Sequence, residues 1–248
     1  MATALRAAEP AKPFLLHLPG IGGHMLIDDR VTAGILAGGL DAEVEIYDWT
    51  DGNFGLPALG GYAHNQLQSA KIAERITAVY RADPKRRIIL TSHSGGGGLA
   101  VWALEKLPDD VKIDTLLLLA PALSPKYDLS KALSHVTGKA YAFTSTLDPI
   151  NGWGTKGFGT IDRVQTEAAG NVGFKIPTGA DLTQYAKLIS FPYNSTWTQL
   201  GNAGDHIGTM TSIFGRVMLA PLLLTGKLPE LAPTSQPTVP SPGTPGEG

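Results

Sequence analysis

The chain has 248 residues, of which 43% are hydrophobic, and its 20 Lys and Arg against 22 Asp and Glu give a formal net charge of −2. That apolar content is enough to build a full-sized core, which excludes a chain that is disordered throughout. The sequence contains no cysteine, which excludes disulfide scaffolds, thiolate metal sites and cysteine nucleophiles. A near-neutral charge without a block of Lys and Arg argues against nucleic acid or an anionic membrane surface as the main partner.

Composition divides the chain into three parts. Residues 1–13 are small and polar and predict an N-terminal arm, while residues 14–225 form the predicted domain. Residues 226–248 are dominated by Pro, Thr, Ser and Gly without apolar periodicity, which predicts a disordered tail. No run reaches the ~20 apolar residues of a membrane span, and no early apolar segment resembles a signal peptide. We therefore expect no membrane span and a cytoplasmic location.

Short apolar runs alternate with helical patterns along the predicted domain. Apolar residues three and four positions apart predict a helix at residues 69–80, and a further apolar stripe follows Gly208. Several of the short runs are apolar at every position, as expected for parallel strands that are covered on both faces. This alternation predicts an α/β fold whose mostly parallel sheet has helices on both faces. Its six strands are expected at residues 14–18, 44–47, 87–91, 115–119, 140–143 and 188–191.

In such a sheet, chemistry collects at the carboxyl ends of the strands. The strand at residues 87–91 runs into Ser92-His93-Ser94-Gly95-Gly96, followed by a helical stretch at residues 99–106. A serine between a strand and a helix, with glycine two residues later, is typical of a nucleophile elbow, although Ser92 stands where the motif has its first glycine. Ser94 is therefore the candidate nucleophile, and Ser92 is the weaker alternative. The alternative to a nucleophile elbow is a glycine-rich turn between strand and helix that serves only close packing.

The first predicted strand ends in the glycine loop Leu18-Pro19-Gly20-Ile21-Gly22-Gly23. A glycine loop beside the nucleophile strand can direct a backbone N–H at a developing oxyanion, and we expect Ile21 and Gly95 to supply the two donors. A dinucleotide fingerprint is the alternative, but Met25 occupies the position of its third glycine. Neither glycine run contains the Gly-Lys-Ser/Thr sequence of a Walker A loop.

An acid and a histidine complete the pattern. Asp148 follows the fifth predicted strand, and His206 lies in a loop just before the last apolar stripe. The order Ser94, Asp148, His206 is the chain order of α/β-hydrolase triads. Asp162 is the alternative acid, whereas Asp114 precedes a strand and is expected at the opposite end of the sheet.

With these motifs the chain resembles the α/β-hydrolase family over residues 14 to about 224. The resemblance implies a serine hydrolase of the esterase or lipase kind, without cofactor or metal, in which His206 takes a proton from Ser94 and Asp148 orients the imidazole. Because about thirteen residues precede the first strand, we expect the family's antiparallel first strand pair to be missing. Residues 120–138 are too few for a large lid domain, so the expected fold is compact.

The insert at residues 150–183 is longer than a simple crossover and is expected to cover the site. We expect its Trp153 and Phe158, together with His93 of the elbow, to bind the substrate. A metal cluster of His17, His24 and His93 is the remaining alternative in these loops, but the spacing does not match a metal motif.

The expected activity is cleavage of a small-molecule carboxylic ester through an acyl-enzyme intermediate. An amidase or peptidase on the same triad is one alternative, because the pocket and not the fold decides the substrate. A non-catalytic binding protein with this fold is the other. We expect no nucleic-acid partner, and the sequence carries no signal for an oligomeric state.

Overall fold

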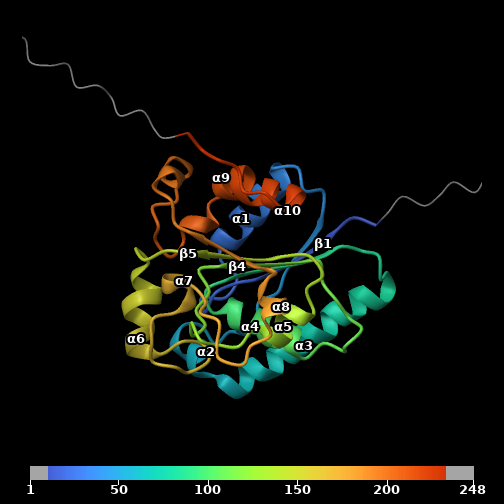
Figure 1. The fold of residues 1–248 in the computed structure, drawn as a ribbon, viewed down its shortest axis with the longest axis horizontal. Coiled ribbons are helices and arrows are strands. Elements are labelled where there is room, and N and C mark those ends of the chain that lie inside the picture. Colours follow the sequence, from blue (N-terminus) through green and yellow to red (C-terminus); the bar gives the residue numbers. More distant parts are fainter. Residues whose placement is uncertain (1–10, 233–248) are drawn as a thin grey trace, which may run out of the picture.

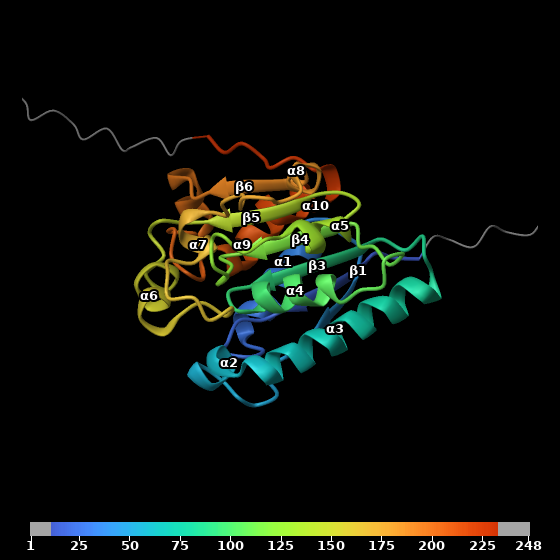
Figure 2. The ribbon, with the colours of Figure 1, turned by 60° about the horizontal axis from the view of Figure 1, so that its bottom comes forward.

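The computed structural model describes residues 11–232 and contains a single parallel sheet. Its strand order is β2-β1-β3-β4-β5-β6, and every neighbouring pair runs parallel (Figure 2). The six strands confirm the predicted α/β fold, and within residues 11–232 no antiparallel strand is added to the sheet. They are β1 (Phe14–Leu18), β2 (Glu43–Ile46), β3 (Ile88–His93), β4 (Thr115–Leu119), β5 (Ala140–Thr144) and β6 (Leu188–Pro192).

Helices cover both faces of the sheet (Figure 1). One face carries α1 (Leu26–Ala37), α9 (Ser212–Phe214) and α10 (Ala220–Thr225). The opposite face carries α3 (Tyr62–Ala82), α4 (Gly96–Glu105), α5 (Ser130–Ser134) and α8 (Leu182–Tyr185). Near the carboxyl ends of the strands lie α2 (Leu56–Gly60), α6 (Thr155–Phe158) and α7 (Ala169–Val172).

The central strands are apolar at successive positions because both of their faces are buried. In β4, Leu116 and Leu118 belong to the core under α3 and α4, whereas Leu117 and Leu119 belong to the core under α1. Side chains alternate along a strand, so one continuous apolar run serves two cores. The sheet is therefore a rigid platform that is anchored from both sides.

The segment after Gly208 departs from the single helix that its apolar stripe indicates. It consists of a 3₁₀ turn (Gly208–Met210), α9, a π turn (Gly215–Leu219) and α10. Pro221 lies at the start of α10, where its missing N–H interrupts the regular hydrogen bonds. A Cβ added to Gly215 would lie 2.7 Å from the Val31 carbonyl oxygen of α1. The two segments thus meet backbone against backbone, which favours local irregularity over a regular helix.

The predicted arm and tail lie partly outside the described residues. Of the arm at residues 1–13, only residues 11–13 are described, and residues 233–248 of the tail are not. The described start of the tail packs on the protein, since Leu228 and Leu231 contact the core under α1 and α10. These two leucines of the predicted tail supply apolar surface to the domain. Within residues 11–232, no helix is long and apolar enough to cross a membrane.

Candidate functional site

Ser94 sits in a sharp turn between β3 and α4. Its φ of +53° lies in the left-handed region, which costs a residue with a Cβ about 1–2 kcal/mol. Backbone hydrogen bonds hold the turn: the Ser94 N–H donates to the Leu119 carbonyl, and the Ser94 carbonyl accepts from the N–H of Gly97 and of Ala122, each at 3.0 Å. This strained conformation lies at the point where the chain leaves β3 and enters α4.

The glycines after Ser94 are required by the close approach of α4 to β1. A Cβ added to Gly96 would collide with the carbonyl oxygens of Pro19 and Leu18. The first turn of α4 therefore lies directly against the end of β1. This contact brings the elbow and the glycine loop together.

His206 lies between Ser94 and Asp148. Its Nε2 is 2.9 Å from Ser94 Oγ, and its Nδ1 is 2.7 Å from Asp148 Oδ2. Because a carboxylate only accepts, the Nδ1–H donates to Asp148 and Nε2 is left to accept from the Ser94 hydroxyl. All three side chains are buried. The three residues singled out in the sequence therefore meet in one hydrogen-bonded row.

Asp148 is held by a network of backbone donors and buried amides. Its Oδ1 accepts from the N–H of Ile150 at 2.9 Å and of Asn151 at 3.0 Å. The Asn171 side chain donates to the carbonyl oxygens of Ser145 at 3.0 Å and Asp148 at 3.2 Å. Sequence reasoning missed Asn151 and Asn171, because a single asparagine in an insert carries no pattern that distinguishes it from a surface residue.

His93 supports His206 through the backbone. Its Nε2–H donates to the His206 carbonyl oxygen at 2.9 Å, and the two ring centroids are 4.9 Å apart. Burial, followed by the repulsion from His206, lowers the pKa of His93 to about 3, so the ring stays neutral beside the other histidine. His93 lines the pocket in front of Ser94, and its polar contact in the described structure is to the protein itself.

The glycine loop after β1 lies against the elbow. A Cβ on Gly20 would lie 3.2 Å from Ser94 Cβ, and a Cβ on Gly95 would lie 2.7 Å from Ile21 Cγ2. No hydrogen bond within residues 11–232 uses the N–H of Ile21 or of Gly95. Both expected oxyanion donors thus lie near Ser94, and their N–H groups have no hydrogen-bond acceptor within residues 11–232.

Three buried side chains hold the glycine loop and the start of α1. His17 Nε2–H donates to Asp28 Oδ1 at 2.9 Å, while Asp28 Oδ2 accepts from the Met25 N–H at 2.8 Å. The indole N–H of buried Trp49 donates to the Pro19 carbonyl at 2.7 Å. The sequence suggested His17 only as an alternative metal ligand, whereas in the structure its side chain is hydrogen-bonded to Asp28.

Comparison with solved structures gives the same architecture. An acetylxylan esterase aligns with 14% sequence identity and a TM-score of 0.50, covering 89% of this chain and 99% of the esterase. This chain has the α/β-hydrolase fold. Two further similar structures are a lipase/esterase from Lactobacillus plantarum (14% identity, 82% and 85% of the two chains, TM-score 0.47) and Est1E from Butyrivibrio proteoclasticus (12%, 88% and 90%, TM-score 0.45). No protein-family model and no curated protein matches the sequence.

In this α/β-hydrolase fold, a pocket of about 270 Å³ opens in front of Ser94 and His206. Its apolar lining comes from the glycine loop, the start of α1 and the loops that carry the acid and the histidine, and comprises Ile21, Met25, Ile27, Ile150 and Ile207. Because these five side chains make its surface predominantly apolar, the pocket suits an apolar group of modest size.

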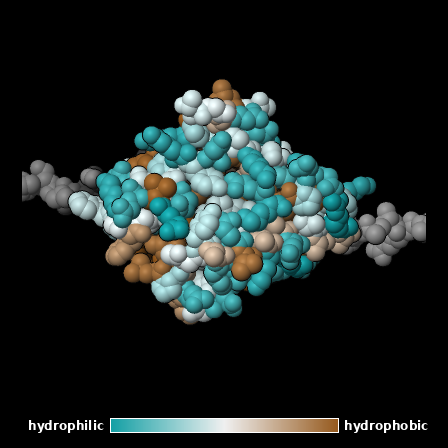
Figure 3. All heavy atoms as spheres, turned by 90° about the horizontal axis from the view of Figure 1, so that it is seen from below, coloured by the Kyte–Doolittle hydropathy of each residue, from teal (hydrophilic) through white to brown (hydrophobic). Residues whose placement is uncertain are grey.

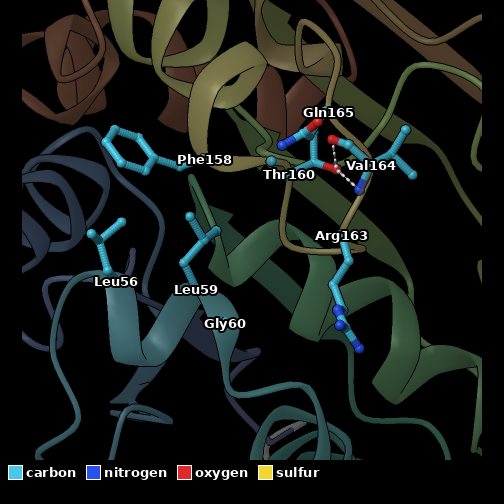
Figure 4. A pocket seen from close by; sticks show the side chains of 9 residues that line it. Leu56, Leu59, Gly60, Phe158, Thr160, Arg163, Val164 and Gln165 are labelled. Atoms are coloured by element: carbon cyan, nitrogen blue, oxygen red, sulfur yellow. Dashed lines mark hydrogen bonds between the residues drawn. The ribbon is translucent and has the colours of Figure 1, made fainter.

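The insert contributes differently from the sequence-based expectation. Ile150 lines the serine pocket, whereas Trp153 and Phe158 are not among its lining residues. Trp153 is 84% exposed, and Phe158 lines a second cleft of about 690 Å³ between α2 and residues 158–165 (Figure 4). Trp153 lies in the π turn Ile150–Gly154 and Phe158 is the last residue of α6, so the structure places neither side chain in the lining of the serine pocket, contrary to the expectation.

The alternative site residues lie elsewhere in the hydrolase fold. Ser92 is inside β3, paired with β1 and β4. Asp162 accepts from the backbone and hydroxyl of Ser124, and Asp114 binds Arg87 at the amino ends of the strands. Neither carboxylate meets His206.

The described residues also contain no group of three or more histidine and acidic side chains that could hold a metal ion. His24 Nε2–H donates to the exposed Asp29 carboxylate at 2.8 Å, while His17 is buried against Asp28. His17, His24 and His93, the residues of the alternative metal cluster, thus each have a different hydrogen-bond partner.

Proposed function

We propose that this protein is a serine hydrolase that cleaves carboxylic esters, with Ser94, His206 and Asp148 as the catalytic triad. The observation that carries the proposal is the row of two hydrogen bonds, 2.9 Å from Ser94 Oγ to His206 Nε2 and 2.7 Å from His206 Nδ1 to Asp148 Oδ2. A nucleophile, a base and a group that orients the base, all within hydrogen-bond reach, are the arrangement that nucleophilic catalysis needs.

In the first step, the Ser94 oxygen attacks the ester carbonyl carbon while its proton moves to His206 Nε2. Asp148 keeps the imidazole in the tautomer whose Nε2 accepts, and stabilises the imidazolium that forms. The tetrahedral intermediate collapses as the C–O bond to the alcohol breaks, and the alcohol leaves with the proton from His206.

The negative charge on the carbonyl oxygen develops beside the glycine loop. The N–H groups of Ile21 and Gly95 are the proposed donors to this oxyanion, each worth about 3 kcal/mol of the barrier by analogy with measured donors. Both N–H groups are without a partner within residues 11–232, which supports the assignment. Trp49 holds Pro19 and Asp28 holds Met25, on either side of Ile21 in the chain. Such fixed ends would keep the loop from having to rearrange during the reaction.

Water then hydrolyses the acyl-enzyme. His206 removes a proton from the water, the hydroxide oxygen attacks the acyl carbon, and the Ser94 oxygen leaves with that proton. Ester and water are converted to acid and alcohol, and the three side chains return to their starting protonation. The aliphatic lining of the 270 Å³ pocket supports an apolar group on one side of the ester.

The deciding experiment is labelling with a fluorophosphonate probe, followed by mass spectrometry of the modified peptide. We expect a single adduct on Ser94 and none in Ser94→Ala. A folded protein without an adduct would contradict the proposal and favour a binding role. If the adduct forms, a panel of esters and matched amides separates an esterase from an amidase, with faster turnover of esters expected.

A further inference from the structure

The second cleft, between α2 and residues 158–165, has no role in the proposed mechanism. Its volume of about 690 Å³ exceeds that of the serine pocket, and it falls within the range of small-molecule sites. Leu56 and Phe158 line it although they are 54% and 69% exposed. Apolar side chains gather at this end of the molecule in Figure 3, on the flank where Figure 1 shows α2 and α6. Exposed apolar side chains that gather around a cleft indicate a binding surface.

Both walls of the second cleft are attached to the expected oxyanion donors. On the α2 side, the Gly55 N–H donates to the Ile21 carbonyl at 2.7 Å. On the other side, a Cβ on Gly95 would lie 3.7 Å from Ile161 Cδ1, and Ile161 follows Thr160 of the cleft. An ester carbonyl at Ser94 would therefore have the small pocket on one side and the larger cleft within reach on the other.

The cleft also carries a cation that no carboxylate of residues 11–232 neutralises. Arg163 lines the cleft across from Leu56 and Leu59 (Figure 4). In the described part of the chain, four other arginines do form an ion pair with a carboxylate: Arg75, Arg81, Arg86 and Arg87. Within residues 11–232, Arg163 forms no ion pair, so its guanidinium is available to an anion.

Arg163 is held rigidly in a conformation that an arginine rarely adopts. Its φ is +66°, and its N–H donates to the Thr160 carbonyl at 2.8 Å. The turn is anchored on both sides, by buried Ile161 against the α4 glycines and by the Asp162 carboxylate on Ser124. Left-handed strain at a residue with a Cβ persists only where the surroundings impose it, and such positions gather at ligand sites.

We propose that the second cleft binds the longer arm of the substrate and that Arg163 recognises an anionic group at the far end of that arm. The inference rests on the proposed ester hydrolysis and names a substrate class for it: an ester with an apolar chain that ends in a carboxylate or similar anion. The leucines and Phe158 receive the chain, and the guanidinium pairs with the anion. The apolar side chains of the second cleft and the positive charge of Arg163 together complement one amphipathic molecule.

Binding is tested first, in the full-length Ser94→Ala variant, by calorimetric titration with octanoate, 1-octanol and octylammonium. We expect octanoate to bind best, and Arg163→Gln to weaken octanoate about tenfold while leaving octanol unchanged. Phe158→Ala should weaken both. Arg216→Gln removes an exposed arginine outside the cleft and should change nothing. Equal octanoate affinity with and without Arg163 would overturn the inference.

Kinetics then separates this inference from the proposed function. The wild-type protein is given 4-nitrophenyl octanoate and the 4-nitrophenyl monoester of octanedioic acid, which differs by a terminal carboxylate. We expect kcat/KM to favour the monoester by about tenfold, and Arg163→Gln to abolish that preference with the octanoate rate unchanged. Hydrolysis without any Arg163 effect refutes only the anion site. Arg163-dependent octanoate binding without hydrolysis refutes only the esterase.

Discussion

His93 Nε2–H donates a 2.9 Å hydrogen bond to the carbonyl oxygen of His206. The donor belongs to the residue before the candidate nucleophile, and the acceptor belongs to the candidate base, so one contact couples the positions of both. The bond fixes the backbone of the histidine loop, while Asp148 fixes the ring. Because burial keeps His93 neutral, it performs this role without placing a second positive charge beside the imidazolium.

Replacing His93 should therefore change turnover more than substrate binding. We expect His93→Phe to lower kcat about tenfold or more with a nearly unchanged KM, because the misplaced imidazole matters most in the transition state. His93→Gln keeps an N–H donor and should retain most of the rate. Steady-state kinetics on the two variants checks this, and equal losses in both would show that packing of the ring, and not the hydrogen bond, is what counts.

His93 should also make the protein less stable in acid. Its pKa is lowered by burial from 6.5 to about 3, so between these values the unfolded chain binds a proton that the folded protein does not. The free energy of unfolding therefore falls as pH drops from about 6.5 toward 3. Urea unfolding at a series of pH values should give a shallower decline for His93→Gln than for the parent. Parallel curves would mean that the folded protein accommodates the charge.

The strain at Ser94 predicts different stabilities for two inactive variants. Ser94→Ala removes the hydroxyl but keeps the Cβ, and hence the strain at φ +53°. Ser94→Gly relieves the strain and should be more stable than Ser94→Ala by about 1 kcal/mol. Chemical denaturation measures the difference. An alanine variant as stable as the glycine variant would show that the turn relaxes when the hydroxyl is lost.

The proposed role of Asp148 is tested by two variants in which an aspartate is replaced by asparagine. Asp148→Asn should reduce kcat about 10⁴-fold, because an amide no longer enforces the histidine tautomer whose Nε2 accepts from Ser94. Asp162→Asn serves as the control, since Asp162 bonds Ser124 and not His206, and it should stay within a few-fold of the parent. The reverse ranking in an ester assay would transfer the role to Asp162.

The approach of α4 to β1 predicts a large effect of one methyl group. Gly96→Ala should destabilise the protein by about 1–3 kcal/mol, because the new Cβ overlaps two carbonyl oxygens that cannot move independently. Gly157→Ala, in α6 with no atom within 4 Å of the new Cβ, should be neutral or slightly stabilising. Melting temperatures of the two variants suffice, and a stable Gly96→Ala would contradict the packing.

Local patterns in the sequence were sufficient to predict the sheet and to single out Ser94, Asp148 and His206, which the structure brings into hydrogen-bond contact. Strands β1 and β4 begin and end at the residues that their apolar runs predict, because a strand that is buried on both faces must be apolar throughout. Parallel strands also share one carboxyl edge, so Ser94 and Asp148, each placed just after a strand, had to lie near each other. Element boundaries were less certain: β3 runs two residues past its predicted end, which puts Ser92 inside the strand.

Only the tertiary structure decided what surrounds these residues. Trp153 and Phe158 looked suited to the serine pocket, but the insert has no periodicity that states which side chains turn inward, and Ile150 and Ile207 line the pocket instead. The bond from His93 to His206 joins residues 113 positions apart, and no local propensity encodes such a contact. The cleft at Arg163 likewise exists only where α2 and the insert meet. Hydrophobic pattern determines which strands form, whereas the shape of a pocket follows from how distant loops pack.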